Sequence, residues 1–216
     1  MQDNVEVKGI ILKSEPIGDY DRRVVILTDT RGKISAFARG ARKPNSRFVA
    51  GTNPFVFADF KLYEGKNSYS LNEVEVHNYF DELRTDYQGA YYGMYMLEIA
   101  DYYTRENNDE KEMLKLLYQS LRALMSPALD NRLVRLIYEI KSTVINGEFP
   151  GPRDNARYKE ATLYAVDYIV KSSIEKLYTF TVKPENLKEL EEIAADTCRQ
   201  TMDYPFKSLE ILNTLT

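Results

Sequence analysis

Six positive side chains lie in a stretch of sequence that contains no aspartate or glutamate. The stretch runs from Thr30 to Ala58, and its cations are Arg31, Lys33, Arg39, Arg42, Lys43 and Arg47. The whole 216-residue chain has a net charge of −4, so this stretch is locally opposite in sign to the protein. Lysine and arginine bind phosphate and release its counterions. The stretch therefore predicts an anion-binding surface.

Two more arginines and one aromatic ring extend the predicted surface. Arg22 and Arg23 enter a strand rich in β-branched residues, and Phe37 shares one face of the next expected strand with Arg39. Aromatic rings stack on the bases of single-stranded nucleic acid. The candidate nucleic-acid-binding residues are Arg22, Arg23, Lys33, Phe37, Arg39, Arg42, Lys43 and Arg47.

Three other interpretations of the basic stretch remain open. The cations could pair with Asp19, Asp21 or Asp29 and bind no ligand. A protein-interaction scaffold could use the basic loop to dock an acidic protein partner. A module that binds single-stranded RNA would need the same residue types. Titration of labelled DNA and RNA at two salt concentrations separates these alternatives, because phosphate binding weakens steeply with salt.

Residue types that support covalent or metal chemistry are scarce. The chain has one histidine, His77, and one cysteine, Cys198. It therefore cannot form an internal disulfide or a multi-cysteine zinc site. We expect His77 to be a surface or capping residue and Cys198 to be a small buried hydrophobe. The sequence thus predicts no catalytic residue, no bound metal and no cofactor.

The positioning elements change type near residue 80. Before it, apolar residues alternate or run in short β-branched stretches, which predicts strands at 5–12, 23–29, 33–39, 54–64 and 69–76, with a turn at 15–21. After it, the period becomes 3.6, which predicts helices at 86–106, 107–125, 126–147, 155–173 and 184–202. The predicted fold is an all-β N-terminal OB-type five-stranded barrel, residues 1–80, followed by an all-α C-terminal helical domain, residues 81–216.

Charge also differs between the two parts. Residues 1–80 carry a net charge of +2 and residues 81–216 carry −6, which indicates two surfaces with different partners. No apolar run reaches the ~20 residues of a membrane span. The N-terminal residues, MQDNVEVK, lack the basic and apolar regions of a signal peptide. We expect a cytoplasmic protein that does not enter membranes.

The residues that form these patterns resemble a known family. About residues 7–75 resemble the N-terminal domain of the bacterial DNA repair protein RecO family. The resemblance rests on the stretches VKGIIL, IGDYDRRVVILTDTRGKISAFARGARKPNSRF and PFVFADFKLYEGKNSYSLNEVEV. YMLEIADYY and PFKSLEIL match the helical part of that family more loosely. Many members carry a four-cysteine zinc cluster where residues 146–166 here contain no cysteine. We expect no zinc, and a loop held by packing and stiffened by Pro150 and Pro152.

The resemblance implies a DNA-binding recombination mediator without a catalytic site. RecO-like proteins bind single- and double-stranded DNA, anneal complementary strands, and assist loading of RecA together with RecR. A groove on the helical domain receives the acidic, phenylalanine-ending C-terminal tail of single-strand-binding protein. Arg132 and Arg135 are candidate rim charges of that groove. The implied location is the bacterial cytoplasm, at the nucleoid.

Overall fold

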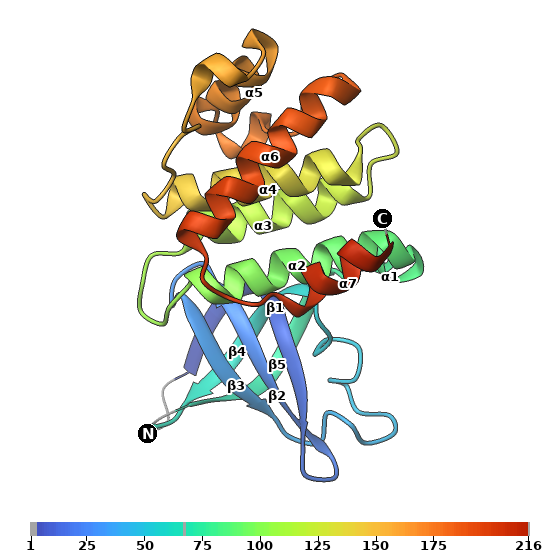
Figure 1. The fold of residues 1–216 in the computed structure, drawn as a ribbon. Coiled ribbons are helices and arrows are strands. Elements are labelled where there is room, and N and C mark those ends of the chain that lie inside the picture. Colours follow the sequence, from blue (N-terminus) through green and yellow to red (C-terminus); the bar gives the residue numbers. More distant parts are fainter. Residues whose placement is uncertain (1–3, 67, 216) are drawn as a thin grey trace. The chain divides into compact units, whose positions relative to one another are not determined.

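A computed structural model describes residues 4–66 and 68–215 (Figure 1). Five strands come first: β1 Asn4–Ile17, β2 Asp21–Thr28, β3 Lys33–Ala38, β4 Phe57–Glu64 and β5 Tyr69–Asn78. The α-helices of the described residues are α1 Asp81–Thr85, α2 Tyr87–Tyr103, α3 Lys111–Leu124, α4 Asn131–Ile145, α5 Glu160–Lys171, α6 Pro184–Thr201 and α7 Lys207–Leu215. Short 3₁₀ turns lie at Asn155–Arg157 and Ile174–Lys176. The prediction of a β part followed by a helical part is confirmed.

The five strands form a closed barrel in the order β1-β2-β3-β5-β4. β1 closes it because the strand has two antiparallel partners: Asn4–Ile10 pairs with β4, and Gly9–Ile17 pairs with β2. The register shifts between Ile11 and Lys13, where a bulge bends the strand from one partner toward the other. β3 and β5 pair in parallel through two residue pairs, Ala36 with Tyr69 and Phe37 with Ser70.

Alternation along the strands builds the barrel core. On β3, Ile34, Ala36 and Ala38 are buried, and the residues between them are partly exposed, as the sequence predicts. The 18-residue segment between β3 and β4 forms turns rather than a strand or helix. Its Ala41 and Phe48 join the buried core, so this segment packs as part of the barrel and not as a loose insertion.

Several boundaries differ from the prediction, and two of them have a clear physical reason. A turn was expected at 15–21, but β1 continues through Pro16 to Ile17 and the turn is confined to 18–20. Proline is tolerated near the end of a hairpin, where a missing N–H interrupts little of the ladder. The helix expected from about residue 126 begins at Asn131, because Asp130 caps it: Oδ1 accepts a hydrogen bond from the backbone N–H of Arg132 at 2.8 Å.

Contacts divide the chain into two compact units that do not separate at residue 80. One unit contains Met1–Asp81 together with Leu97–Leu114, and the other contains Glu82–Met96 with Lys115–Thr216. Backbone hydrogen bonds explain why the segment after α2 belongs with the barrel. The N–H of Lys33 donates to the carbonyl of Arg105, and the N–H of Asn107 donates to that of Arg31, each at 3.0 Å. These bonds attach the segment to the β2–β3 turn.

The helical unit contains a buried lysine that satisfies a helix end. α4, α5 and α6 pack against one another. Lys141 of α4 is 7% exposed, and its Nζ donates to the carbonyls of Ile169, Val170 and Ser172 at 3.2, 2.9 and 2.8 Å. The last carbonyls of a helix have no partner within the helix. A positive charge there also complements the helix dipole of α5.

Polar contacts hold the cysteine-free segment within residues 146–166, for which the resemblance raised the question of a zinc cluster. Its residues from Arg153 to Arg157 are exposed, so packing alone does not hold it, contrary to expectation. Arg153 pairs with Asp196 at 3.1 Å, Arg157 with Glu192 at 2.7 Å, and Glu189 accepts from the N–H of Lys159 at 3.0 Å. All three acidic residues lie on α6.

A zinc ion does not fit this segment. It contains no cysteine, and the carboxylates that face it on α6 already bind arginine, lysine and backbone groups. Among the residues that the structure describes, no group of three or more histidine, cysteine, aspartate or glutamate side chains could hold a metal ion. Within the same residues, no helix is long and apolar enough to cross a membrane.

Candidate nucleic-acid interface

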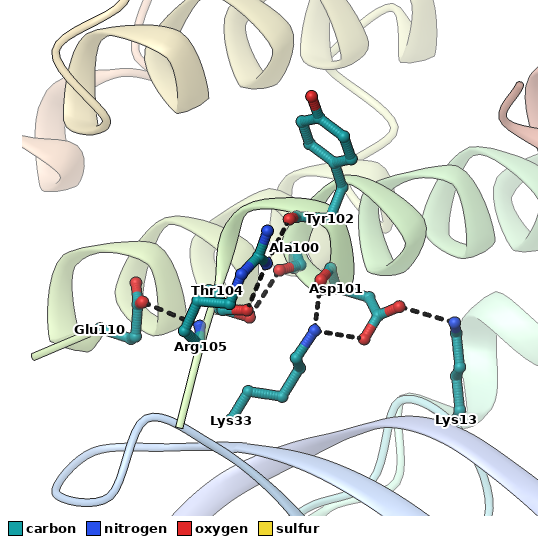
Figure 2. A network of polar contacts seen from close by, with 8 residues as sticks. All are labelled: Lys13, Lys33, Ala100, Asp101, Tyr102, Thr104, Arg105 and Glu110. Atoms are coloured by element: carbon teal, nitrogen blue, oxygen red, sulfur yellow. Dashed lines mark hydrogen bonds and ion pairs between the residues drawn. The ribbon is translucent and has the colours of Figure 1, made fainter. Parts of the chain in front are cut away.

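The cations of the acid-free stretch divide into two groups. Arg31 pairs with Glu64 at 3.6 Å, and Lys33 pairs with Asp101 at 2.9 Å while also donating to the backbone carbonyl of Asp101. Figure 2 shows Lys13 completing this network from β1, at 2.6 Å from the Asp101 carboxylate. The charges of Arg31 and Lys33 are therefore balanced by acidic groups that lie far away in the sequence.

Asp101 lies where helix α2 ends, within the same compact unit as the barrel. Burial would raise the pKa of its carboxyl, but the hydrogen bonds from Lys13 and Lys33 outweigh burial, and the pKa lies below its usual value. Lys33 is 20% exposed at its side chain. It attaches the α2 end to the barrel and presents little charge to solvent.

The second group consists of Arg39, Arg42, Lys43 and Arg47, and all four are exposed. Arg42 donates to the carbonyl of Gly18 at 3.1 Å, and Arg47 donates to the carbonyl of Asn72. These contacts orient the side chains without neutralising them. Within the described part of the chain, no carboxylate forms an ion pair with any of the four. Together they place a charge of +4 on the turn-rich segment between β3 and β4, residues 39–56, which we call the basic segment.

The aspartates that could have balanced these cations are engaged elsewhere or stand apart. Asp21 accepts a hydrogen bond from the backbone N–H of Gly40 at 2.7 Å, and Asp29 accepts one from the N–H of Lys8 at 3.1 Å. Neither these two nor Asp19 forms an ion pair with an arginine or lysine of the second group, as far as the structure describes the chain. The interpretation that local pairing removes the charge does not apply to this group.

Arg22 fixes the shape of the basic segment rather than lying free on it. Its Nη1 donates to Thr52 Oγ1 and Asn53 Oδ1, each at 2.9 Å, and to the carbonyl of Val49 at 3.3 Å. Burial, and then the nearby charge of Arg42, lower the pKa of Arg22. An arginine remains protonated despite such a shift. Arg22 therefore adds positive charge beside Arg42 and ties β2 to the segment.

Arg23 and Phe37 lie on the outer face of neighbouring strands. They are cross-strand partners of β2 and β3, and Arg23 donates from Nε to Ser35 Oγ at 3.0 Å. Phe37 is partly exposed, which leaves ring surface available to a ligand. Arg39 comes directly after β3 and continues this face toward the turn-rich segment.

The structure brings most of the sequence-predicted residues together and separates one. Next to the β1–β2 turn lie Arg22, Arg42 and Lys43. The outer face of β2 and β3 carries Arg23 and Phe37, and Arg39 follows directly after β3. The side chain of Arg47 contacts β5. Lys33 is six residues from Arg39 along an extended strand, a separation of about 20 Å. Its role in the α2 attachment distinguishes it from the other seven. We call the remaining seven residues the basic surface: Arg22, Arg23, Phe37, Arg39, Arg42, Lys43 and Arg47.

One aromatic residue beside this surface escaped the sequence analysis. Tyr20 lies in the β1–β2 turn and is 53% exposed, and the Nζ of Lys43 stands 5.5 Å from its ring centre. The residues are 23 positions apart in an irregular region. Neither a periodicity nor a motif in the sequence predicts the contact between Lys43 and the Tyr20 ring.

His77 and Cys198 belong to different compact units of the chain. His77 is on the outer face of β5 and its Nε2 lies 2.7 Å from Asp59 Oδ2. Cys198 belongs to the helical unit, where burial raises the pKa of its thiol well above the usual value. A raised thiol pKa disfavours the nucleophilic thiolate. Cys198 is partly exposed, not fully buried as expected.

The described residues thus form a surface of exposed cations on a closed β-barrel that is followed by a helical unit. Two family models match the chain: "Recombination protein O N terminal" over residues 1–80 and "Recombination protein O C terminal" over residues 84–151. The chain belongs to the recombination protein O family, a family of DNA repair and recombination proteins.

Relatives cover nearly the whole chain. The chain is 26% identical to the DNA repair protein RecO of Acetivibrio thermocellus, over 98% of this chain and 97% of the relative. It is 27% identical to that of Clostridium novyi, over 97% and 94%. The DNA repair protein RecO of Moorella thermoacetica is 36% identical over a shorter region, 57% of this chain and 47% of the relative.

Proposed function

We propose that this protein is a non-catalytic recombination mediator that binds single- and double-stranded DNA through the basic surface. The observation that carries the proposal is the cluster of four exposed cations, Arg39, Arg42, Lys43 and Arg47, that form no ion pair with a described carboxylate. Their charge is available to phosphate. The strand order also supports assignment of the barrel to the OB type, a fold that binds oligonucleotides.

Annealing of complementary strands follows from the same surface. Two negative strands repel one another, and an array of cations lowers that repulsion when both strands lie on it. Contacts to phosphate carry no sequence information. Base identity is therefore left to pairing between the strands, and no covalent step or cofactor is needed.

Protein partners are proposed for the helical unit, because family membership implies RecR, single-strand-binding protein and, indirectly, RecA. We propose that the acidic tail of single-strand-binding protein enters a cavity of about 320 Å³ in this unit. Arg135 and Arg199 line it, and Phe206 supplies an aromatic wall. The Nε of Arg135 is buried and donates no hydrogen bond to any described residue, but it lies 3.6 Å from Glu139 Oε1, so this guanidinium would meet a tail carboxylate as part of an ion pair. Arg132, the other candidate, pairs with Asp130 at 2.9 Å.

The decisive experiment is a salt titration of DNA affinity with a charge-matched control. The test variant replaces the four unpaired cations by alanine: Arg39→Ala, Arg42→Ala, Lys43→Ala and Arg47→Ala. The control removes four exposed lysines of the helical unit: Lys171→Ala, Lys176→Ala, Lys188→Ala and Lys207→Ala. Both variants change net charge by the same amount.

Each phosphate contact to a single strand contributes about −0.7 to the slope of log affinity against log salt. We therefore expect the test variant to have a slope shallower by up to about 3, and the control to match the wild type. Equal slopes for the test variant and the wild type would refute the proposal. Comparison of DNA with RNA of equal length checks the alternative of an RNA-binding module.

A further inference from the structure

Three of the exposed apolar side chains of the barrel stand beside the unpaired cations. Ile17 and Tyr20 flank the tip of the β1–β2 hairpin, and Val49 lies on the basic segment; they are 38%, 53% and 41% exposed. Val49 is connected to the hairpin because its carbonyl accepts from Arg22. Of the three, Tyr20 contacts a cation with its ring, and a ring beside a cation suits a ligand with both an aromatic and an anionic part.

The backbone at Tyr20 is held by the basic segment, and Lys43 of that segment contacts the Tyr20 ring. The backbone N–H of Arg42 donates to the Tyr20 carbonyl at 2.8 Å, and the Arg42 guanidinium donates to the Gly18 carbonyl at 3.1 Å. Gly18 has a φ of +54°, which glycine adopts without strain and which lets the hairpin turn tightly. Lys43 lies over one face of the ring, so the exposed ring surface is on the remaining face and edge. A residue whose backbone is ordered before binding loses less conformational entropy on binding than one in a disordered loop.

We propose, on the basis of the proposed function, that Tyr20 is a stacking platform for an unpaired base and that this part of the basic surface selects single strands. Every base has an aromatic face, so stacking is compatible with sequence-independent binding. Lys43 stands over the ring and Arg42 beside it, so both reach the phosphates that flank a stacked base. A duplex offers those phosphates but keeps its bases paired, and therefore cannot use the ring.

An experiment with three probes separates stacking from charge. The probes are an oligothymidylate strand, an abasic sugar-phosphate strand of equal length and a duplex of equal length, each labelled for fluorescence anisotropy. The variants are Tyr20→Ala, Tyr20→Phe and Tyr79→Ala. Tyr79 is another exposed tyrosine of the barrel unit, at 37%, and it contacts no cation of the basic surface within the described residues.

Base stacking on an aromatic ring predicts that Tyr20→Ala weakens oligothymidylate binding about ten-fold. The same variant should leave the abasic strand and the duplex unchanged, and Tyr20→Phe and Tyr79→Ala should bind all three probes as the wild type does. Equal loss on the abasic strand, or no loss on oligothymidylate, would overturn the stacking role while leaving the cation surface intact. Failure of the wild type to bind any probe would instead overturn the proposed function together with this inference.

Discussion

Arg22 offers a direct test of how the basic segment is held. Its Nη1 bonds to three acceptors on the segment, Val49, Thr52 and Asn53. Arg22→Met keeps the length and much of the apolar volume of the side chain but removes the donors and the charge. The matched control is Arg23→Met, which removes an identical charge from the next residue and breaks only one hydrogen bond, to Ser35.

The expected loss of stability follows from the acceptors left behind. A net hydrogen bond contributes about 1 kcal/mol, and charged donors contribute somewhat more. Thr52 is fully buried, whereas Val49 is exposed and can rebind water. We therefore expect Arg22→Met to lower the free energy of unfolding by about 2 kcal/mol, equivalent to a fall in Tm of about 6 °C for a chain of this size. Arg23→Met should lower it by about 0.5 kcal/mol or less.

Two measurements distinguish positioning from charge. Amide hydrogen exchange should accelerate between residues 47 and 53 in Arg22→Met and remain unchanged there in Arg23→Met. DNA affinity at low salt should fall about ten-fold in Arg22→Met, compared with two- to three-fold in Arg23→Met, because loss of order adds to loss of one phosphate contact. If the two variants exchange and bind alike, the reasoning that Arg22 holds the segment in place is wrong.

Three further predictions concern the rest of the molecule. Lys141→Met should lower the free energy of unfolding by about 3 kcal/mol, because three carbonyls near the end of α5 lose a charged donor. The control Lys171→Met removes an exposed ion pair with Asp167 and should change the free energy of unfolding by less than about 0.5 kcal/mol. Urea unfolding followed by circular dichroism compares the two variants. The pKa of Asp101 is lower in the folded than in the unfolded protein, so the stabilising effect of its carboxylate is present at neutral pH and is lost as the pH falls below about 4. Asp101→Asn should therefore have a lower free energy of unfolding in urea than the wild type at pH 7, and this difference should vanish in acid. The raised thiol pKa of Cys198 predicts slow reaction with a disulfide reagent at pH 8 in the native protein and fast reaction after unfolding in urea; equal rates would contradict it.

The sequence alone predicts which segments form strands and which form helices. Alternation on β3 and the 3.6-residue period after residue 80 predicted the β part and the helical part, since each period reports which side chains face a core. The boundary errors at Pro16 and at the start of α4 arose because residue types alone do not say whether a strand continues past a proline or which polar residue caps a helix. The family resemblance and the acid-free stretch likewise needed no coordinates.

Which of those cations remain available was decided only by the tertiary structure. Lys33 is 68 residues from Asp101, and Arg31 is 33 residues from Glu64, so no local pattern reveals that these charges are paired. The same holds for the contact between Lys43 and Tyr20. Ion pairs and ring contacts depend on distances between side chains, and those distances are set by how the strands close and where the end of α2 docks. The amino-acid composition of the stretch determined that its charge is positive, and the tertiary structure determined which of its cations remain unpaired.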